Sequence, residues 1–219
     1  MRKFTQAAVA GALALALSGT ANAAVTIGSI TAGTNPYSGP APTYNFDTLG
    51  TTPTTVGGAV VSGTNSSHAQ PFGSAGSYFS VGPSDTQPGT IDLSSFGDID
   101  SLSFLWGSVD SYNVLDFLAA DGVTILGHFV GNDIFNPANG NQSDPNTNPV
   151  VTFLLNGGSQ SSFTYLRLTT DPSQNAFEID NLAINPVPEP ATWAMMLLGF
   201  CGIGMAMRRR STHGLAQVA

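Results

Sequence analysis

The chain has 219 residues and a formal net charge of −8 at pH 7, with six Lys and Arg against fourteen Asp and Glu. So few basic residues exclude nucleic-acid binding, because phosphate neutralisation requires clustered Lys and Arg. The single cysteine, Cys201, excludes a fold held by internal disulfides. Between residues 24 and 187 the imbalance is larger, since Arg167 is the only Lys or Arg there and faces thirteen acidic residues.

The first 23 residues have the pattern of a secretory signal peptide. Arg2 and Lys3 precede an apolar stretch from Ala7 to Leu17, and Ala21-Asn22-Ala23 is an A-x-A cleavage site. We therefore expect export through the Sec translocon and a mature chain that begins near residue 24. Residues 24–187 are then one exported domain, long enough to form a hydrophobic core.

The exported domain has an all-β pattern. It is rich in Gly, Ser, Thr, Asn and Pro, and no long segment has an apolar period of 3.6. Short alternating segments recur at intervals of about ten residues, which predicts roughly nine to eleven strands in a two-sheet antiparallel sandwich of the jelly-roll type. The predicted strands are 24–30, 43–47, 54–62, 77–81, 90–93, 101–106, 114–119, 123–130, 150–155, 164–168 and 176–184.

Three sequence features predict further details. Asp121-Gly122 predicts a two-residue hairpin turn, because Gly accepts a positive φ. The apolar alternation changes phase between Ile179 and Leu182, which predicts a bulge at Asp180-Asn181. Residues 131–149 form a long loop rich in Asn and Asp, side chains that either cap turns or bind cations and glycan hydroxyls.

Three carboxylates near the two ends of the domain are candidate Ca²⁺ ligands. Asp47 follows an early strand, and Glu178 and Asp180 lie on the closing one. The first and last strands of a jelly roll commonly pair, which would bring these groups together for a cation that takes about six to eight oxygen ligands. The alternative is that they are solvated positions and turn caps, because no calcium loop of fixed spacing is present.

Tyr112, Asp110 and Asn113 are the candidate glycan-binding residues. Sugar binding needs an exposed aromatic ring beside hydrogen-bonding side chains, and these three share one predicted turn. Trp106 lies on the apolar face of its predicted strand, so we expect it in the core.

No catalytic residues are predicted, and we expect a protein that is not an enzyme. A Gly-x-Ser-x-Gly elbow and a His-Glu-x-x-His motif are missing from the sequence, and the exported domain contains no cysteine. His68 and His128 are isolated in the sequence, and we interpret them as surface or strand residues.

The C-terminal stretch combines three features in a fixed order. Pro188-Glu189-Pro190 is expected to stay extended and outside any helix, because proline fixes φ and lacks an amide donor. Residues 191–207 carry no charge and predict one transmembrane helix, about 25 Å long. Arg208, Arg209 and Arg210 are a stop signal that stays in the cytoplasm, and residues 211–219 are a cytoplasmic extension. Cys201 is interpreted as a packing residue of the helix.

This order of features, together with Trp193, resembles the PEP-CTERM sorting signal of Gram-negative bacteria. The resemblance implies processing by exosortase, a membrane-embedded cysteine transpeptidase-like enzyme, and a link to exopolysaccharide or biofilm matrix. It also implies an inner-membrane intermediate and a final place at the cell surface or in the extracellular matrix. The implied motif residues are Pro188, Glu189, Pro190, Trp193, Arg208, Arg209 and Arg210.

A second resemblance is carried by residues 105–113 and 177–182, which are similar to a group of exosortase-dependent surface proteins of unknown activity. It brings no catalytic residues. The sequence as a whole predicts an exported, acidic, non-catalytic structural or binding protein associated with exopolysaccharide. The alternatives are a carbohydrate-binding module, with or without Ca²⁺, and a polysaccharide hydrolase with two carboxylates across a cleft.

Overall fold

The computed structural model describes residues 24–47, 53–156, 163–171, 174–187 and 190–211. The predicted signal peptide, Pro188-Glu189 and residues 212–219 lie outside these described residues.

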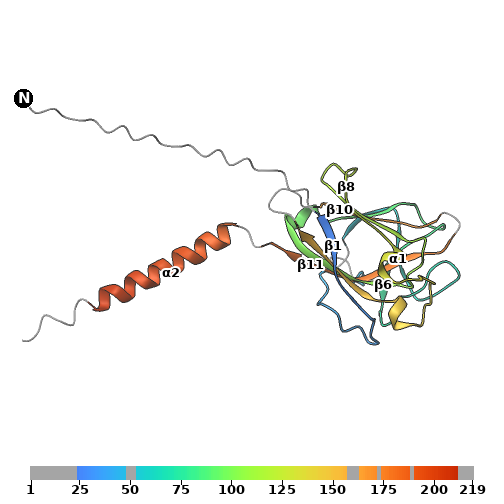
Figure 1. The fold of residues 1–219 in the computed structure, drawn as a ribbon, viewed down its shortest axis with the longest axis horizontal. Coiled ribbons are helices and arrows are strands. Elements are labelled where there is room, and N and C mark those ends of the chain that lie inside the picture. Colours follow the sequence, from blue (N-terminus) through green and yellow to red (C-terminus); the bar gives the residue numbers. More distant parts are fainter. Residues whose placement is uncertain (1–23, 48–52, 157–162, 172–173, 188–189, 212–219) are drawn as a thin grey trace, which may run out of the picture.

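The described residues form a sandwich of two antiparallel sheets (Figure 1). One sheet has six strands in the order β1-β9-β6-β11-β4-β3, and the other has five in the order β2-β5-β10-β7-β8. The predicted two-sheet sandwich is thereby confirmed. The strands are β1 (Ala24–Thr31), β2 (Thr54–Val56), β3 (Ala59–Ser62), β4 (Ser77–Val81), β5 (Gly89–Asp92), β6 (Ile99–Gly107), β7 (Val114–Leu118), β8 (Ile125–Val130), β9 (Val150–Asn156), β10 (Tyr165–Thr169) and β11 (Phe177–Pro186). The helical elements are η1 (Ser94–Phe96), α1 (Gly131–Ile134), η2 (Pro145–Thr147) and α2 (Pro190–Ser211).

The inward side chains of both sheets form one hydrophobic core. Trp106 is fully buried, as predicted, and stacks on Phe177 with ring centroids 4.4 Å apart. Phe117 of β7 and Phe153 of β9 join the two sheets, with ring centroids 5.0 Å apart. Burying each such side chain contributes about 1.5–3 kcal/mol, so the alternating aromatic and aliphatic residues account for the stability of a domain without disulfides.

Two predicted strands differ in the structure. The segment predicted as one strand over 54–62 forms two, because Gly57 and Gly58 have φ of +68° and +62° and carry the chain from one sheet to the other. β2 pairs with β5, whereas β3 pairs with β4. The segment predicted as a strand over 43–47 makes only an isolated bridge between Tyr44 and Leu182.

The turn between β7 and β8 is wider than the predicted two-residue hairpin. Gly122 has φ +69°, and Asp121 Oδ1 accepts hydrogen bonds from the Val123 and Thr124 amides. Strand pairing resumes only at Ile125. Val123 and Ile125 are therefore 75% and 49% exposed.

β11 lies in the middle of the six-stranded sheet, where it pairs with β6 and β4. β1 is an edge strand that pairs with β9, so the expectation that the first and last strands pair is wrong. The register of β11 against β6 shifts between Asp180 and Ala183, and Asn181 has φ +53°. The predicted bulge at Asp180-Asn181 is thereby confirmed.

The helix α2 follows the sandwich and extends away from it (Figure 1). Its side chains from Met195 to Met207 are exposed, and Cys201, interpreted above as a packing residue, is exposed as well. In the part of the chain that the structure describes, no helix combines the length and apolar character needed to cross a membrane, so the predicted transmembrane helix is not supported.

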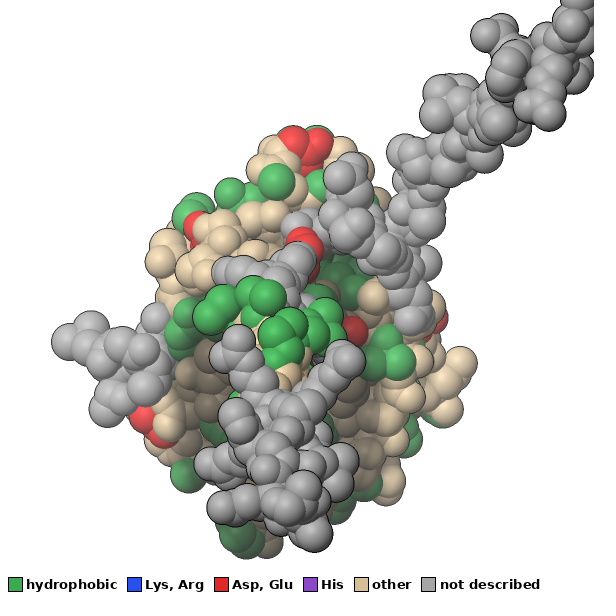
Figure 2. All heavy atoms as spheres, turned by 90° about the vertical axis from the view of Figure 1, so that its left-hand side faces the viewer, with side chains coloured by type: hydrophobic (Ala, Val, Ile, Leu, Met, Phe, Trp, Pro, Cys, Tyr) green, Lys and Arg blue, Asp and Glu red, His purple; other side chains and the backbone are tan. Residues whose placement is uncertain are grey.

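Uncharged side chains and backbone dominate the face of the sandwich from which α2 leaves (Figure 2). Acidic side chains are scattered over this view, and no basic side chain is visible in it. The distribution agrees with the acidic composition of the exported domain.

Candidate functional site

Residues 63–76, called here the covering segment, lie across the outer face of the six-stranded sheet. The Ala69 amide donates to Glu178 Oε1 at 2.9 Å, and Ser74 Oγ donates to Asp180 Oδ2 at 2.6 Å. Each of these carboxylate residues is only 1% exposed, although both side chains point away from the core. They are therefore buried between the sheet and the covering segment, and neither is a solvated position.

The burial changes the acidity of both carboxyls. Burial raises the pKa of Glu178 to about 7, and hydrogen bonds from Ala69 and Ser108 oppose the rise. Burial likewise raises the pKa of Asp180 to about 7, opposed by hydrogen bonds from Ser74 and Asn181. Each group is thus divided between its charged and neutral forms near neutral pH.

The structure does not bring the three candidate calcium ligands together at one point. Asp47 Oδ1 accepts from the Ser77 amide at 2.6 Å, and the charge of Asp47 raises the pKa of Asp180. Glu178 instead interacts with Asp110. Among the described residues, no three His, Cys, Asp or Glu side chains gather in a way that could hold a metal ion.

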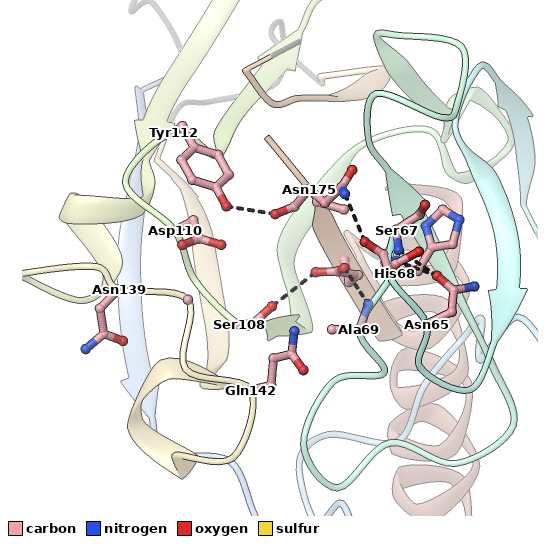
Figure 3. Close-up of a pocket in the computed structure, with 14 residues that line it drawn as sticks. Asn65, Ser67, His68, Ala69, Ser108, Asp110, Tyr112, Asn139, Gln142 and Asn175 are labelled. Carbon is pink, nitrogen blue, oxygen red and sulfur yellow. Dashed lines mark hydrogen bonds between the residues drawn. The ribbon is translucent and has the colours of Figure 1, made fainter. Parts of the chain in front are cut away.

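A polar pocket of about 160 Å³ lies beside Glu178 (Figure 3). Tyr112 and Asp110, both predicted to bind glycans, line one side of it, and the covering segment lines the other. Tyr112 Oη donates to the Asn175 carbonyl at 2.7 Å. Burial raises the pKa of Asp110, an effect that Tyr112 opposes, and burial also raises the pKa of Tyr112.

Asn113, the third predicted glycan-binding residue, does not line the pocket. It is fully buried, and its Oδ1 accepts from the Asp110 amide at 2.9 Å and from Trp106 Nε1 at 3.4 Å. Its Nδ2 donates to the Ala176 carbonyl at 3.3 Å. Asn113 therefore positions the turn that carries Asp110 and Tyr112.

The pocket contains residues that the sequence analysis missed. His68 lines it from the covering segment, and its Nδ1 lies 2.9 Å from Ser80 Oγ and 3.8 Å from Asp85 Oδ2. Gln142, from the loop between β8 and β9, also lines the pocket. For Gln142, the richness of that loop in Asn and Asp was the only sequence signal.

Several Asn and Asp side chains of the same loop cap turns. Asp144 Oδ1 accepts from the Asn146 amide at 2.9 Å, and Asn141 Oδ1 accepts from the Ser143 amide at 3.0 Å. Asn148 Oδ1 accepts from the Ser108 amide at 2.8 Å, which ties the loop to the turn after β6. Turn capping is thus the observed role of Asp144 and Asn141, whereas Asn148 links the loop to distant parts of the chain.

A family model for the PEP-CTERM protein-sorting motif matches residues 186–210. The chain carries a PEP-CTERM sorting motif. The predicted sorting residues all fall inside this match, and the motif implies exosortase as the processing partner and a cell-surface or extracellular destination in Gram-negative bacteria. No curated protein and no solved structure matches the chain.

The PEP-CTERM motif begins where β11 ends and includes nearly all of α2. Pro190 is the first residue of α2, so the expectation that it stays outside any helix is wrong. Proline is tolerated at the first helical position because the amide it lacks would have no partner there. The helix continues through Arg208–Arg210 and ends at Ser211.

A separate ionic cluster lies on the outer face of the five-stranded sheet. Arg167 Nη2 donates to Asp116 Oδ2 at 2.7 Å, and His128 Nδ1 lies 2.7 Å from Asp116 Oδ1. The sequence analysis treated His128 as isolated. Strand alternation places each of the three on an outward face, but their contact depends on a register that local sequence does not show.

Proposed function

We propose that this is an exported surface or matrix protein, sorted by exosortase through its PEP-CTERM tail, with a non-catalytic structural or binding role associated with exopolysaccharide. The observation that carries the proposal is the PEP-CTERM motif at residues 186–210, which starts where the last strand of the sandwich ends. Residues 1–23 direct export through the Sec translocon. The tail then holds the chain at the inner membrane, where exosortase recognises Pro188-Glu189-Pro190.

The non-catalytic role is supported by the way the pocket acids are held. Glu178 accepts from Ala69 at one oxygen and from Ser108 Oγ at the other, at 2.9 and 3.2 Å. A carboxylate whose two oxygens are held in this way fastens the covering segment to the sheet, whereas a general acid or base must exchange its proton with a substrate.

The test is sorting in a Gram-negative host that produces exosortase. We expect the wild-type chain to lose its tail and reach the surface fraction, and Glu189→Ala and a triple Arg208, Arg209, Arg210→Gln variant to keep the tail. Asp100→Asn, at an exposed position of β6, is the matched control and should behave as wild type. Intact mass and cell fractionation report the outcome. Unchanged processing of both motif variants would refute the proposal.

A second candidate is a carbohydrate-binding module, with or without Ca²⁺. The observation in its favour is that Tyr112 and Asp110, which the sequence marked for glycan binding, line one polar pocket together with Glu178. Glycan arrays probed with the full chain in detergent, with and without a chelator, test it. Retention of no sugar under either condition would count against it.

A further inference from the structure

We infer that the pocket beside Glu178 binds one uncharged sugar residue, and that it rejects sugars that carry a carboxylate, sulfate or phosphate. The inference rests on the proposed role at an exopolysaccharide and names the ligand class of the pocket. Its supports are the size of the pocket, the chemistry of its lining and the distribution of charge around it.

The size of the pocket limits the occupant to a small group. Its volume of about 160 Å³ is below the roughly 300–1,000 Å³ that is typical of sites for drug-sized ligands. Four separate parts of the chain converge on it, which are the covering segment, the turn after β6, the loop between β8 and β9, and the start of β11. This enclosure on several sides suits a single sugar ring better than an extended stretch of polysaccharide.

The lining supplies the hydrogen-bonding groups that sugar hydroxyls require. Hydroxyls both donate and accept, so a side-chain amide that does both is a suitable partner. Gln142 lies at the pocket in Figure 3, and its amide makes no hydrogen bond to the described residues. Asp110 offers carboxyl oxygens, and the Tyr112 ring beside it offers an apolar surface for the C–H groups of a sugar.

The charge around the pocket excludes an anionic ligand. Asp110 and Glu178 both line it, and no Lys or Arg is among its lining residues. The Nδ1 atom of His68 lies 2.9 Å from Ser80 Oγ and 3.8 Å from Asp85 Oδ2, so this nitrogen already has partners outside the pocket lining. An anionic sugar would have to leave water and lie beside two acids without a compensating charge, which is unfavourable. A neutral sugar meets no such penalty.

The experiment measures binding of the full chain in detergent to two panels of oligosaccharides of matched length. One panel consists of neutral gluco-, galacto- and manno-oligosaccharides, and the other of uronate oligosaccharides. We expect binding to at least one neutral sugar, unchanged by chelator, and none to the uronates. Gln142→Ala should weaken the neutral binding about five- to tenfold, the effect of one lost hydrogen bond.

Two controls separate loss of the site from loss of the fold. Gln174→Ala removes an amide at an exposed position outside the pocket lining, so it should leave the affinity unchanged. Asp110→Asn keeps the shape of the pocket but removes one of its two carboxyls, so the variant should bind uronates more tightly than the wild type does. Equal binding of both panels by the wild type, binding of Ca²⁺ alone at the pocket, or binding to no sugar would overturn the inference. Exosortase-dependent sorting is tested separately by intact mass and cell fractionation, so a failure of sugar binding would not refute the proposed sorting.

Discussion

The two sheets bury carboxylates on their outer faces in opposite ways. On the six-stranded sheet, Glu178 and Asp180 lie under a stretch of chain that gives them backbone and hydroxyl donors. On the five-stranded sheet, the Asp116 side chain is 5% exposed and lies under Arg167 and His128. The acids of one face are thus satisfied by neutral groups, and the acid of the other is paired with a cation.

The difference shows what a charged partner changes. Arg167 is the only Lys or Arg between residues 24 and 187, so one buried acid of the domain is neutralised by a guanidinium. Glu178 and Asp180 have neutral donors, and burial raises the pKa of each to about 7. One sheet therefore depends on an ion pair, and the other depends on groups whose charge changes near neutral pH.

Removal of the cation should produce the largest effect. Arg167→Met leaves the Asp116 carboxyl buried without its guanidinium partner, and we expect a loss of about 3 kcal/mol in the free energy of unfolding. Urea denaturation of the full chain in detergent measures it. In the double variant Arg167→Met, Asp116→Leu most of the loss should disappear, because no unpaired charge remains. A single variant as stable as wild type would show that the pair contributes nothing.

The next largest effect is expected from pH, because the two acids of the six-stranded sheet have a pKa raised to about 7. The pKa of Glu178 rises from 4.5, and that of Asp180 from 3.8, each to about 7 in the folded chain. At pH values between the unfolded and the folded pKa, the folded state therefore binds more protons than the unfolded state. The free energy of unfolding then decreases as the pH rises toward 7. We expect a decrease on the order of 2 kcal/mol for each of the two carboxyls between pH 5 and pH 8.

The matched variant for this experiment is Glu178→Gln, Asp180→Asn, which cannot titrate at these positions. The difference in unfolding free energy between wild type and variant should change across the window, because all other carboxyls are common to both. A difference that stays constant from pH 5 to pH 8 would mean that these two groups do not titrate there.

A smaller effect is expected from the fastening of the covering segment. Ser74→Ala removes the hydroxyl that donates to Asp180 Oδ2 and should cost about 1–2 kcal/mol, which lies between the values for a hydrogen bond to a neutral group and to a charged group. Hydrogen exchange at the Ala69 amide should become faster if the segment opens as a unit. Ser95→Ala, at an exposed site, is the control for the loss of a hydroxyl. Unchanged exchange at Ala69 would show that the two attachments are independent.

The smallest effect is expected on the other sheet. The His128 side chain is 56% exposed, and Arg167 remains to pair with Asp116 when His128 is removed. We expect His128→Gln to change the unfolding free energy by less than about 1 kcal/mol. A loss as large as that of Arg167→Met would show that the imidazole, and not the guanidinium, satisfies Asp116.

Features that depend on neighbouring residues were predictable. Alternation placed Trp106 in the core, and the change of phase located the bulge at Asp180-Asn181, because both depend on side-chain direction along one strand. The PEP-CTERM tail was recognisable for a similar reason, since its features follow one another in order. The division of the segment 54–62 between two sheets was missed, although two adjacent glycines mark it.

Features that depend on distant residues were not predictable. The Ala69 amide donates to the Glu178 carboxylate, which lies 109 positions further along the chain. No periodic pattern in the covering segment predicts that contact. The pocket required four such segments to meet. The sequence marked the turn with Asp110 and Tyr112 and the loop at residues 131–149, but it did not show that they lie together. Asn113 was predicted to bind a glycan. Its hydrogen bonds to Trp106 and Ala176 depend on the fold, so the sequence could not show that this side chain is already occupied.

The central place of β11 determines when the domain can be completed. β6 and β4 leave the ribosome before the strand that lies between them, so the six-stranded sheet has a gap until residues 177–186 are synthesised. Those residues directly precede the helix α2. The strand that closes the sheet and the sorting motif are therefore synthesised almost together. A nascent chain truncated before β11 lacks both the middle strand of the sheet and the sorting motif.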